Sequence, residues 1–366
     1  MPGPSRATIA TVLEVAAADA AAGARDGRLT DRVVEALRAA GLFKLHLPPD
    51  LGGLGCTLPE ACDVIAQVAR ADGSAGWAVM IGAGPNWFAG TMPAPLAAEV
   101  FGPDGNVVAG SGVPGTAVEV SGGLRVDGRW PWCSGAPWAT WFTFNVAVGD
   151  RVRTIAVPAA QVRCDPASWD VRGLRATASW TAVLDGVFVP AQRVFDADAS
   201  PTRTEAVFRV PFAAFAHATM AAVSVGMLEH ALDGFRALAR EKVPFGATAV
   251  LAADPVVQDR YAGATAAARA AARSLREATA ALWDACRDRG PGPALCLDLE
   301  LAARHAVATG QRIAGTLYEL AGMSVLPTDS PLGRVLADLA AAGQNALVSG
   351  ASRRGAGAAL LDGPAP

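Results

Sequence analysis

The sequence lacks the positive charge that nucleic-acid and anionic-membrane binders need. Its 366 residues carry a formal net charge of −3, and no stretch is rich in lysine and arginine. Contacts with phosphate backbones or acidic lipids depend on clusters of such cations. We therefore expect neither a nucleic acid nor a membrane as a partner.

Long apolar runs and metal-ligand motifs are also missing. No segment approaches about 20 uninterrupted apolar residues, the length that spans a bilayer, and the alanine-rich start of the chain carries Arg6, Glu14 and Asp19 instead of a signal-peptide pattern. The six cysteines are scattered, without a CxxC pair or a histidine at metal-site spacing. These absences predict a cytoplasmic protein with reduced thiols and no metal.

What is present suffices for two or three packed units, since 52% of the residues are apolar. Residues 1–104 are expected to form a helical domain. The segment 30–39 has a helical period behind a Thr/Asp cap, and further helices are predicted over 58–70 and 73–84. The stretch 47–55 is too rich in Pro and Gly for a regular element, so it predicts a shaped loop.

Residues 105–200 change to short β-rich runs between glycines and prolines. Gly122-Gly123 signals a hairpin between two of these runs. The pattern predicts an antiparallel sheet or small barrel of roughly 90 residues. The predicted strands are 107–108, 116–120, 124–130, 140–148, 153–157 and 183–189.

The helical period returns after about residue 204 in four alanine-rich segments, 206–240, 254–289, 294–322 and 330–361. Asp254-Pro255 and Ser330-Pro331 are typical helix starts, and Gly290 and Gly322 are typical stops. Four such helices predict a four-helix bundle over 201–366. The fold class is therefore α+β: a helical domain, a central β-domain and a bundle.

This order resembles the acyl-CoA dehydrogenase superfamily, and four motifs agree along nearly the whole chain. PPDLGGLG (48–55) is similar to the family's turn after its second helix, and GRWPWCSGAPWATW (128–141) to its flavin-contact strand. GLRATASWTAVLDGVFVP (173–190) is similar to the segment leading to its Val-Pro strand end. The stretch 245–258 resembles the bundle hairpin that approaches the flavin diphosphate.

Two branches of the superfamily differ in chemistry. Dehydrogenases remove an α-proton with a glutamate and pass a hydride to flavin, whereas two-component (group D) monooxygenases bind reduced flavin from a separate reductase and react it with O2. ADGSAGW (71–77), LYELAG (317–322) and SPLGR (330–334) resemble the monooxygenase versions. The stretch 339–361 holds no Asp or Glu, and the other usual place for the base is about Ala216, beside His217. Both places lack a carboxylate, which favours the monooxygenase branch.

The resemblance assigns flavin contacts to particular residues. Ser134 matches the residue whose O–H or backbone N–H sits at flavin N5, with a strand-end serine satisfying its own turn as the alternative. Trp132 and Gly135 would lie against the isoalloxazine ring, with core packing as the alternative for the tryptophan. Candidates for the pyrimidine side or ribityl chain are Ser111 and Thr143, with surface β-propensity as the alternative for Thr143. Those for the phosphates are Arg240 and Phe245, with a solvated helix end as the alternative, and Arg334, with a bundle cap as the alternative.

The histidines depart from the branch's pattern. That branch places one His before a Trp and another after a Gln, where they bind or deprotonate a phenolic substrate, but here Asn86 and Asn345 occupy these positions. Asparagine can orient a substrate but cannot take a proton near neutral pH. His217 remains as a candidate acid/base group, with a satisfied core histidine as the alternative.

These residues predict an oxidoreductase that uses reduced FMN or FAD and O2 to oxygenate a small aromatic or amine substrate. The resemblance implies a separate NAD(P)H flavin reductase and a homo-oligomer, dimer or tetramer, assembled through the bundle. Two alternatives stay open. One is a dehydrogenase or desaturase with His217 or no conventional base, and the other is a binding subunit that has lost catalysis.

Overall fold

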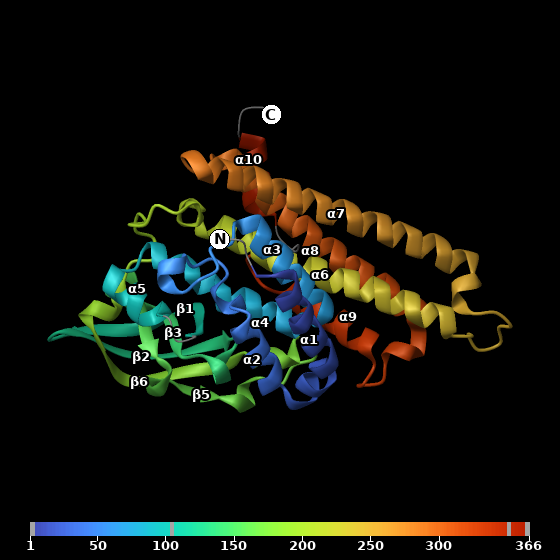
Figure 1. Ribbon diagram of the computed structural model, residues 1–366, viewed down its shortest axis with the longest axis horizontal. Helices are drawn as coiled ribbons and strands as arrows, with labels where there is room; N and C mark the ends of the chain where they lie inside the picture. The colour runs from blue at the N-terminus through green and yellow to red at the C-terminus, as the bar shows by residue number, and fades with distance from the viewer. Residues whose placement is uncertain (1–3, 103–105, 350–352, 363–366) are drawn as a thin grey trace.

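The computed structural model describes residues 4–102, 106–349 and 353–362 (Figure 1). The helical domain contains α1 (Arg6–Asp26), α2 (Asp31–Ala39), α3 (Leu58–Ala71), α4 (Gly73–Ala83) and α5 (Ala94–Phe101). α2, α3 and α4 match the predicted helices to within two residues. α1 and α5 were not predicted, because neither pattern was separated from its alanine-rich or proline-rich surroundings.

Local side-chain caps explain where these helices begin. Thr30 accepts a hydrogen bond from the Val33 N–H, and Thr57 and Glu60 form a reciprocal capping box. The loop before α3 closes on itself at Gly53, where an added Cβ would lie 2.0 Å from the Leu47 carbonyl oxygen. The predicted shaped loop is therefore present, and only glycine fits at its centre.

The β-domain is one seven-stranded sheet in the order β5-β6-β2-β1-β3-β4-β7. Its β1–β2 hairpin turns at Gly122, whose φ of +82° requires glycine, so the predicted hairpin is confirmed. β5 and β7 are too short to have been predicted. The strands are β1 (Val108–Val120), β2 (Gly123–Cys133), β3 (Trp141–Val148), β4 (Arg151–Pro158), β5 (Arg163–Asp165), β6 (Trp180–Pro190) and β7 (Val194–Phe195).

The prediction of a purely antiparallel sheet was wrong, because β1 and β3 pair in parallel. β2 runs antiparallel to β1, and the chain then crosses over β1 through residues 134–140 before β3 begins on its other side. This crossing makes β3 parallel to β1. It also puts the segment that contains Ser134 and Gly135 at one end of the sheet.

The bundle consists of α6 (Phe212–Glu241), α7 (Pro255–Asp288), α8 (Pro293–Ala321) and α9 (Pro331–Ala342), followed by α10 (Arg354–Asp362). The prediction of a continuous fourth helix over 330–361 was wrong. α9 ends before Gly343, and the Asn345 side chain then accepts a hydrogen bond from the Leu347 N–H, which forms a turn in place of a further helical turn. Residues 350–352 lie outside the described residues.

The helical domain and the bundle share one hydrophobic core, in which α3 and α4 pack on α6, while the sheet has a second core of its own. Figure 1 shows the sheet at one end of the molecule and the α6–α7 hairpin at the other. The structure thus confirms the predicted α+β fold. The predicted boundary at 104/105 lies outside the described residues.

Two helices, α1 and α6, are long and apolar enough to cross a membrane by length and composition alone. α6 is a core helix, since 78% of its apolar window is buried inside the fold. α1 packs on α2 and α3.

Candidate functional site

Ser134 lies where β2 ends and the chain crosses to β3. The register with β6 shifts between Trp130 and Cys133, and Trp132 within this bulge has a φ of +62°. The tight turn lets the Ser134 N–H donate to the Trp132 carbonyl oxygen at 2.9 Å. As a result the serine is buried while the Trp132 side chain is 66% exposed.

A line of buried hydroxyl groups begins at Ser134. Its Oγ lies 2.7 Å from Ser179 Oγ, which lies 2.7 Å from Thr177 Oγ1. Thr177 donates to the Leu174 carbonyl oxygen at 2.8 Å, and Trp77 Nε1 on α4 donates to Ser134 Oγ at 3.1 Å. We call these side chains of Ser134, Ser179 and Thr177 the hydroxyl chain. It links the end of β2 to the loop before β6 and to the helical domain.

Backbone strain is concentrated along the hydroxyl chain. Among the described residues, the non-glycine positions with positive φ are Trp132, Leu174 and Ala178. Each such conformation costs about 1–3 kcal/mol and typically persists at functional sites. The Gly135 N–H donates to the Thr177 carbonyl oxygen at 2.9 Å, which ties the two strained segments together.

Two buried carboxyl groups lie near this region, Asp338 from the bundle and Asp72 from the helical domain. Asp338 on α9 accepts a hydrogen bond from the Leu174 N–H at 2.5 Å, and Asp72 caps α4 by accepting from the Ala75 N–H at 2.8 Å. Burial, and then the neighbouring charge of Asp72, raise the pKa of Asp338 to about 7, whereas the hydrogen bond from Leu174 and the charge of Arg334 oppose the shift. Burial also raises the pKa of Asp72. The positive charge of Arg334 opposes the rise in the pKa of both carboxyl groups.

The other predicted flavin contacts on the sheet lie on β1 and β3. Thr143 is buried and pairs with Gly110, where an added Cβ would lie 2.5 Å from the Thr143 carbonyl oxygen. Ser111 follows Gly110, and its Oγ accepts from the Val113 N–H at 3.4 Å within the β1 bulge. The two hydroxyl residues are therefore on adjacent strands.

His217 and Asn345 come together although they lie on different elements. The His217 ring is buried on α6 and bonds to the backbone of Leu347, the residue whose N–H the Asn345 side chain binds at 3.0 Å. Burial lowers the pKa of His217, while Glu300 partly opposes this shift. Burial therefore favours the neutral imidazole, and its Nδ1 has no partner among the described residues.

Asn86 braces the loop before α3. Its Nδ2 donates to the Phe43 carbonyl oxygen at 3.2 Å, and its Oδ1 accepts from the His46 N–H at 3.3 Å. The His46 ring packs edge-on against Phe215 of α6, and burial lowers its pKa to about 3. No sequence signal marks this buried histidine, whose ring nitrogens both lack partners within the described part of the chain.

Two of the three phosphate candidates lie away from Ser134 within one chain. Arg240 is exposed at the end of α6, and Phe245 is fully exposed in the loop that follows. This hairpin lies at the opposite end of the molecule from the sheet (Figure 1). A flavin beside Ser134 could meet these residues only from a second subunit.

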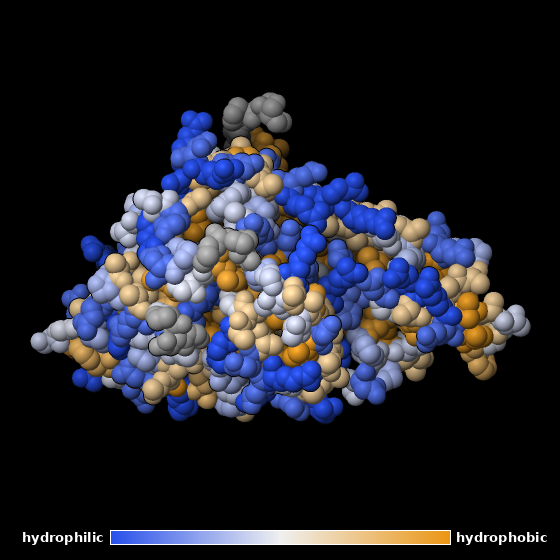
Figure 2. All heavy atoms as spheres, in the orientation of Figure 1, coloured by the Kyte–Doolittle hydropathy of each residue, from blue (hydrophilic) through white to orange (hydrophobic). Residues whose placement is uncertain are grey.

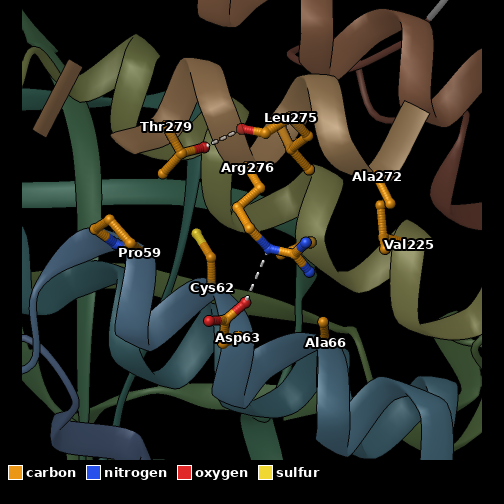
Figure 3. Close-up of a pocket in the computed structure, with 10 residues that line it drawn as sticks. Pro59, Cys62, Asp63, Ala66, Val225, Ala272, Leu275, Arg276 and Thr279 are labelled. Atoms are coloured by element: carbon orange, nitrogen blue, oxygen red, sulfur yellow. Dashed lines mark hydrogen bonds and ion pairs between the residues drawn. The ribbon is translucent and has the colours of Figure 1, made fainter. Parts of the chain in front are cut away.

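A hollow of about 40 Å³ between α3, α6 and α7 is separate from this site (Figure 3). Cys62, Asp63 and Arg276 line it, and none of its lining residues comes from the sheet. Thr279, at its edge, donates to the Leu275 carbonyl oxygen at 2.7 Å. The hollow is too small for a flavin or an aromatic ring, so it is a packing gap.

Comparison with known proteins identifies the family. Models of the acyl-CoA dehydrogenase N-terminal and C-terminal domains match residues 5–91 and 218–349. The chain is 30% identical over 342 residues to indole-3-acetate monooxygenase from Pseudomonas putida, and the aligned region covers 91% of this chain and 87% of that protein. It is also 30% identical over 331 residues to the flavin-dependent monooxygenase oxygenase subunit HsaA from Rhodococcus jostii, covering 85% and 86%.

The fold has a close structural match as well. XiaF from Streptomyces sp., solved in complex with FADH2 and glycerol, aligns with a TM-score of 0.91 over 98% of this chain and 95% of that chain, at 24% identity. The motif resemblance, the domain matches and the relatives agree. The chain therefore belongs to the flavin-dependent monooxygenases of the acyl-CoA dehydrogenase superfamily.

Proposed function

We propose that this chain is the oxygenase component of a two-component monooxygenase, which uses reduced FMN or FAD and O2 to oxygenate a small aromatic or amine substrate. The observation that carries the proposal is the pairing of buried Ser134 with exposed Trp132 at the sheet end. The carboxyl groups near the hydroxyl chain, Asp72 and Asp338, are buried and bind backbone N–H groups. Neither is placed to act as the base of a dehydrogenase.

The residues present fit a flavin. The Trp132 indole offers a flat, solvent-facing surface for a planar ring, and its strained backbone fixes its orientation. Ser134 and Gly135 would lie beside the ring, with Ser111 and Thr143 next to them on β1 and β3. Reduced flavin, when bound there, supplies the electrons that activate O2.

The chain's own residues would position the reactants and keep water out. Trp132 would cover one part of the ring, and Ser134 would hold a hydrogen bond to it. His217, neutral because burial lowers its pKa, would bind a substrate through Nδ1 without adding charge. Asn345 would set the turn that faces His217, and Asn86 the loop that carries His46. These roles orient a substrate that is already electron-rich.

A second copy of the chain would complete the flavin site. Four exposed apolar side chains, Val243, Phe245, Met323 and Leu326, lie on the α6–α7 loop and the turn after α8. Lys242 joins these segments by donating from Nζ to the Ala321 carbonyl oxygen at 2.6 Å. Apolar spheres gather at this end of the molecule in Figure 2. We propose that this end contacts another subunit in a dimer or tetramer, with Arg240 near the flavin phosphates.

The experiment supplies the purified chain with NADH, FAD or FMN, a separate flavin reductase and 18O2. Indole-3-acetate, the compound in the name of the Pseudomonas putida relative, serves as the first substrate, followed by resorcinol and aniline. We expect product carrying one 18O atom by mass spectrometry. Quantitative peroxide without labelled product would contradict oxygenation. Reduction of bound flavin by an acyl thioester would favour a dehydrogenase, and failure to bind flavin in either redox state would favour a binding subunit.

A further inference from the structure

The direction of every hydrogen bond in the hydroxyl chain follows from counting hydrogens. Two oxygens 2.7–2.8 Å apart need one hydrogen between them, and a carbonyl oxygen cannot supply it. Thr177 must therefore give its only hydroxyl hydrogen to the Leu174 carbonyl oxygen. The contact between Thr177 and Ser179 then needs the hydrogen of Ser179, and the contact between Ser179 and Ser134 needs the hydrogen of Ser134.

The counting leaves Ser134 without a free hydrogen. Its hydroxyl hydrogen points inward to Ser179, and its backbone N–H is bonded to the Trp132 carbonyl oxygen. One lone pair of its Oγ accepts from Trp77 Nε1. A hydroxyl oxygen has two lone pairs, so Ser134 retains a single acceptor position and no donor.

The surrounding backbone keeps the hydroxyl chain in this arrangement. Leu174 and Ala178, which flank Thr177, hold strained positive φ values. The Leu174 N–H is bonded to Asp338, and the Thr177 carbonyl oxygen accepts from the Gly135 N–H. The Leu174 carbonyl oxygen that begins the count is therefore fixed from the bundle and from the sheet.

We propose that Thr177 and Ser179 are positioning residues that make Ser134 an obligate hydrogen-bond acceptor, and that this selects reduced over oxidised flavin. The proposal rests on the proposed function, in which Ser134 lies at flavin N5. Reduced flavin carries a hydrogen on N5 and donates, whereas N5 of oxidised flavin has only a lone pair and accepts. An acceptor facing N5 stabilises the first form and repels the second. The hydroxyl chain thus sets the redox preference of the site without charge.

The test measures binding, not turnover. Dissociation constants for reduced FAD and oxidised FAD are determined anaerobically for the wild type, Ser179→Ala and Thr177→Val. The compared quantity is the dissociation constant of oxidised FAD divided by that of reduced FAD. Either substitution frees the Ser134 hydrogen to turn toward N5. A neutral hydrogen bond gained by one form and lost by the other changes the ratio about tenfold. We therefore expect the ratio to fall about tenfold in both variants.

Three further variants separate positioning from damage to the fold. Thr279→Val removes a matched bond, a buried threonine donating to a backbone carbonyl at 2.7 Å, far from the site, and should leave the ratio unchanged. Thr177→Ser keeps the hydroxyl and should restore the wild-type ratio. Trp77→Phe removes a contact on Ser134 but frees no hydrogen, so reduced FAD should stay the favoured form.

The outcomes distinguish the two proposals. If Ser179→Ala and Thr177→Val weaken the binding of both redox forms equally, or leave the ratio as it is, the positioning role of Thr177 and Ser179 is refuted. The monooxygenase assignment then still stands. If the wild type binds neither form while its thermal unfolding is cooperative, the assignment of Ser134 to flavin fails first. A ratio that falls in Thr177→Val supports the proposal, because the Thr177 hydroxyl reaches Ser134 through Ser179.

Discussion

Replacing Asp338 with asparagine should stabilise the protein increasingly as the pH rises. Asp338 is buried, and its pKa is raised from 3.8 to about 7 by burial and by Asp72. The folded carboxyl group therefore keeps its proton up to about pH 7, while the unfolded one loses it near pH 4. The contribution of this group to the free energy of unfolding is fully present below about pH 4. It is lost progressively as the pH rises from there through about 7.

The magnitude follows from the two pKa values. Each unit of pKa difference is worth about 1.4 kcal/mol. Relative to low pH, the free energy of unfolding of the wild type therefore falls by roughly 1.7 kcal/mol at pH 5 and by about 4 kcal/mol at pH 8. An asparagine side chain at this position would not titrate, and its amide oxygen can still accept from the Leu174 N–H. The stability gain of Asp338→Asn over the wild type should therefore grow by roughly 2.5 kcal/mol between pH 5 and pH 8.

Urea unfolding of both proteins at pH 5 and pH 8 measures this difference. Buried histidines such as His46 and His217 titrate in the same way in both proteins, so they cancel in the comparison. Asp63→Asn, at a side chain 62% exposed, is the control and should show no comparable change. A gain that is equal at the two pH values, or that shrinks at pH 8, would refute the reasoning.

Three other predictions concern packing, flavin contact and protonation. Gly226→Ala should destabilise by about 1–3 kcal/mol in urea unfolding, because its Cβ would lie 2.1 Å from the Ala66 carbonyl oxygen, and an unchanged midpoint would contradict this contact. Gly263→Ala, with nothing within 4 Å, is its control and should be stabilising by about 0.5–1 kcal/mol. Trp132→Ala should keep the melting temperature, since the ring is 66% exposed, but weaken reduced-flavin binding about tenfold in an anaerobic fluorescence titration; equal affinity would remove Trp132 from the site. The His217 ring should be neutral at pH 6.5 by 15N NMR, because burial lowers its pKa, and a half-charged ring there would be incompatible with its buried position.

Elements defined by local signals were predictable from the sequence. The capping box of Thr57 and Glu60 and the Asp254-Pro255 start lie within one turn of the helices they begin. Pairings between distant segments were not predictable. The parallel β1–β3 pairing depends on where residues 134–140 cross the sheet, and the stop at Gly343 depends on the turn at Asn345.

The residues of the candidate site show the same difference between local and distant signals. Ser134 and Trp132 could be found because they stand in one short motif. Trp77, Ser179 and Asp338 could not, because the fold brings them to Ser134 and Leu174 from other elements. The spacing of Thr177 and Ser179 around Ala178 was the available signal, but two hydroxyl residues carry no information about hydrogen-bond direction until the Leu174 carbonyl oxygen is in place.

The bracing by Asn86 has a consequence for how this sequence can evolve. An imidazole carries its donor and acceptor on opposite sides of the ring, so histidine at 86 could not bind the Phe43 carbonyl and the His46 N–H together. Each buried backbone group left without a partner would cost about 1–3 kcal/mol. A change to the histidine pattern of the branch therefore requires an accompanying change in the loop from 43 to 46, because the neighbours of Asn86 favour asparagine at this position.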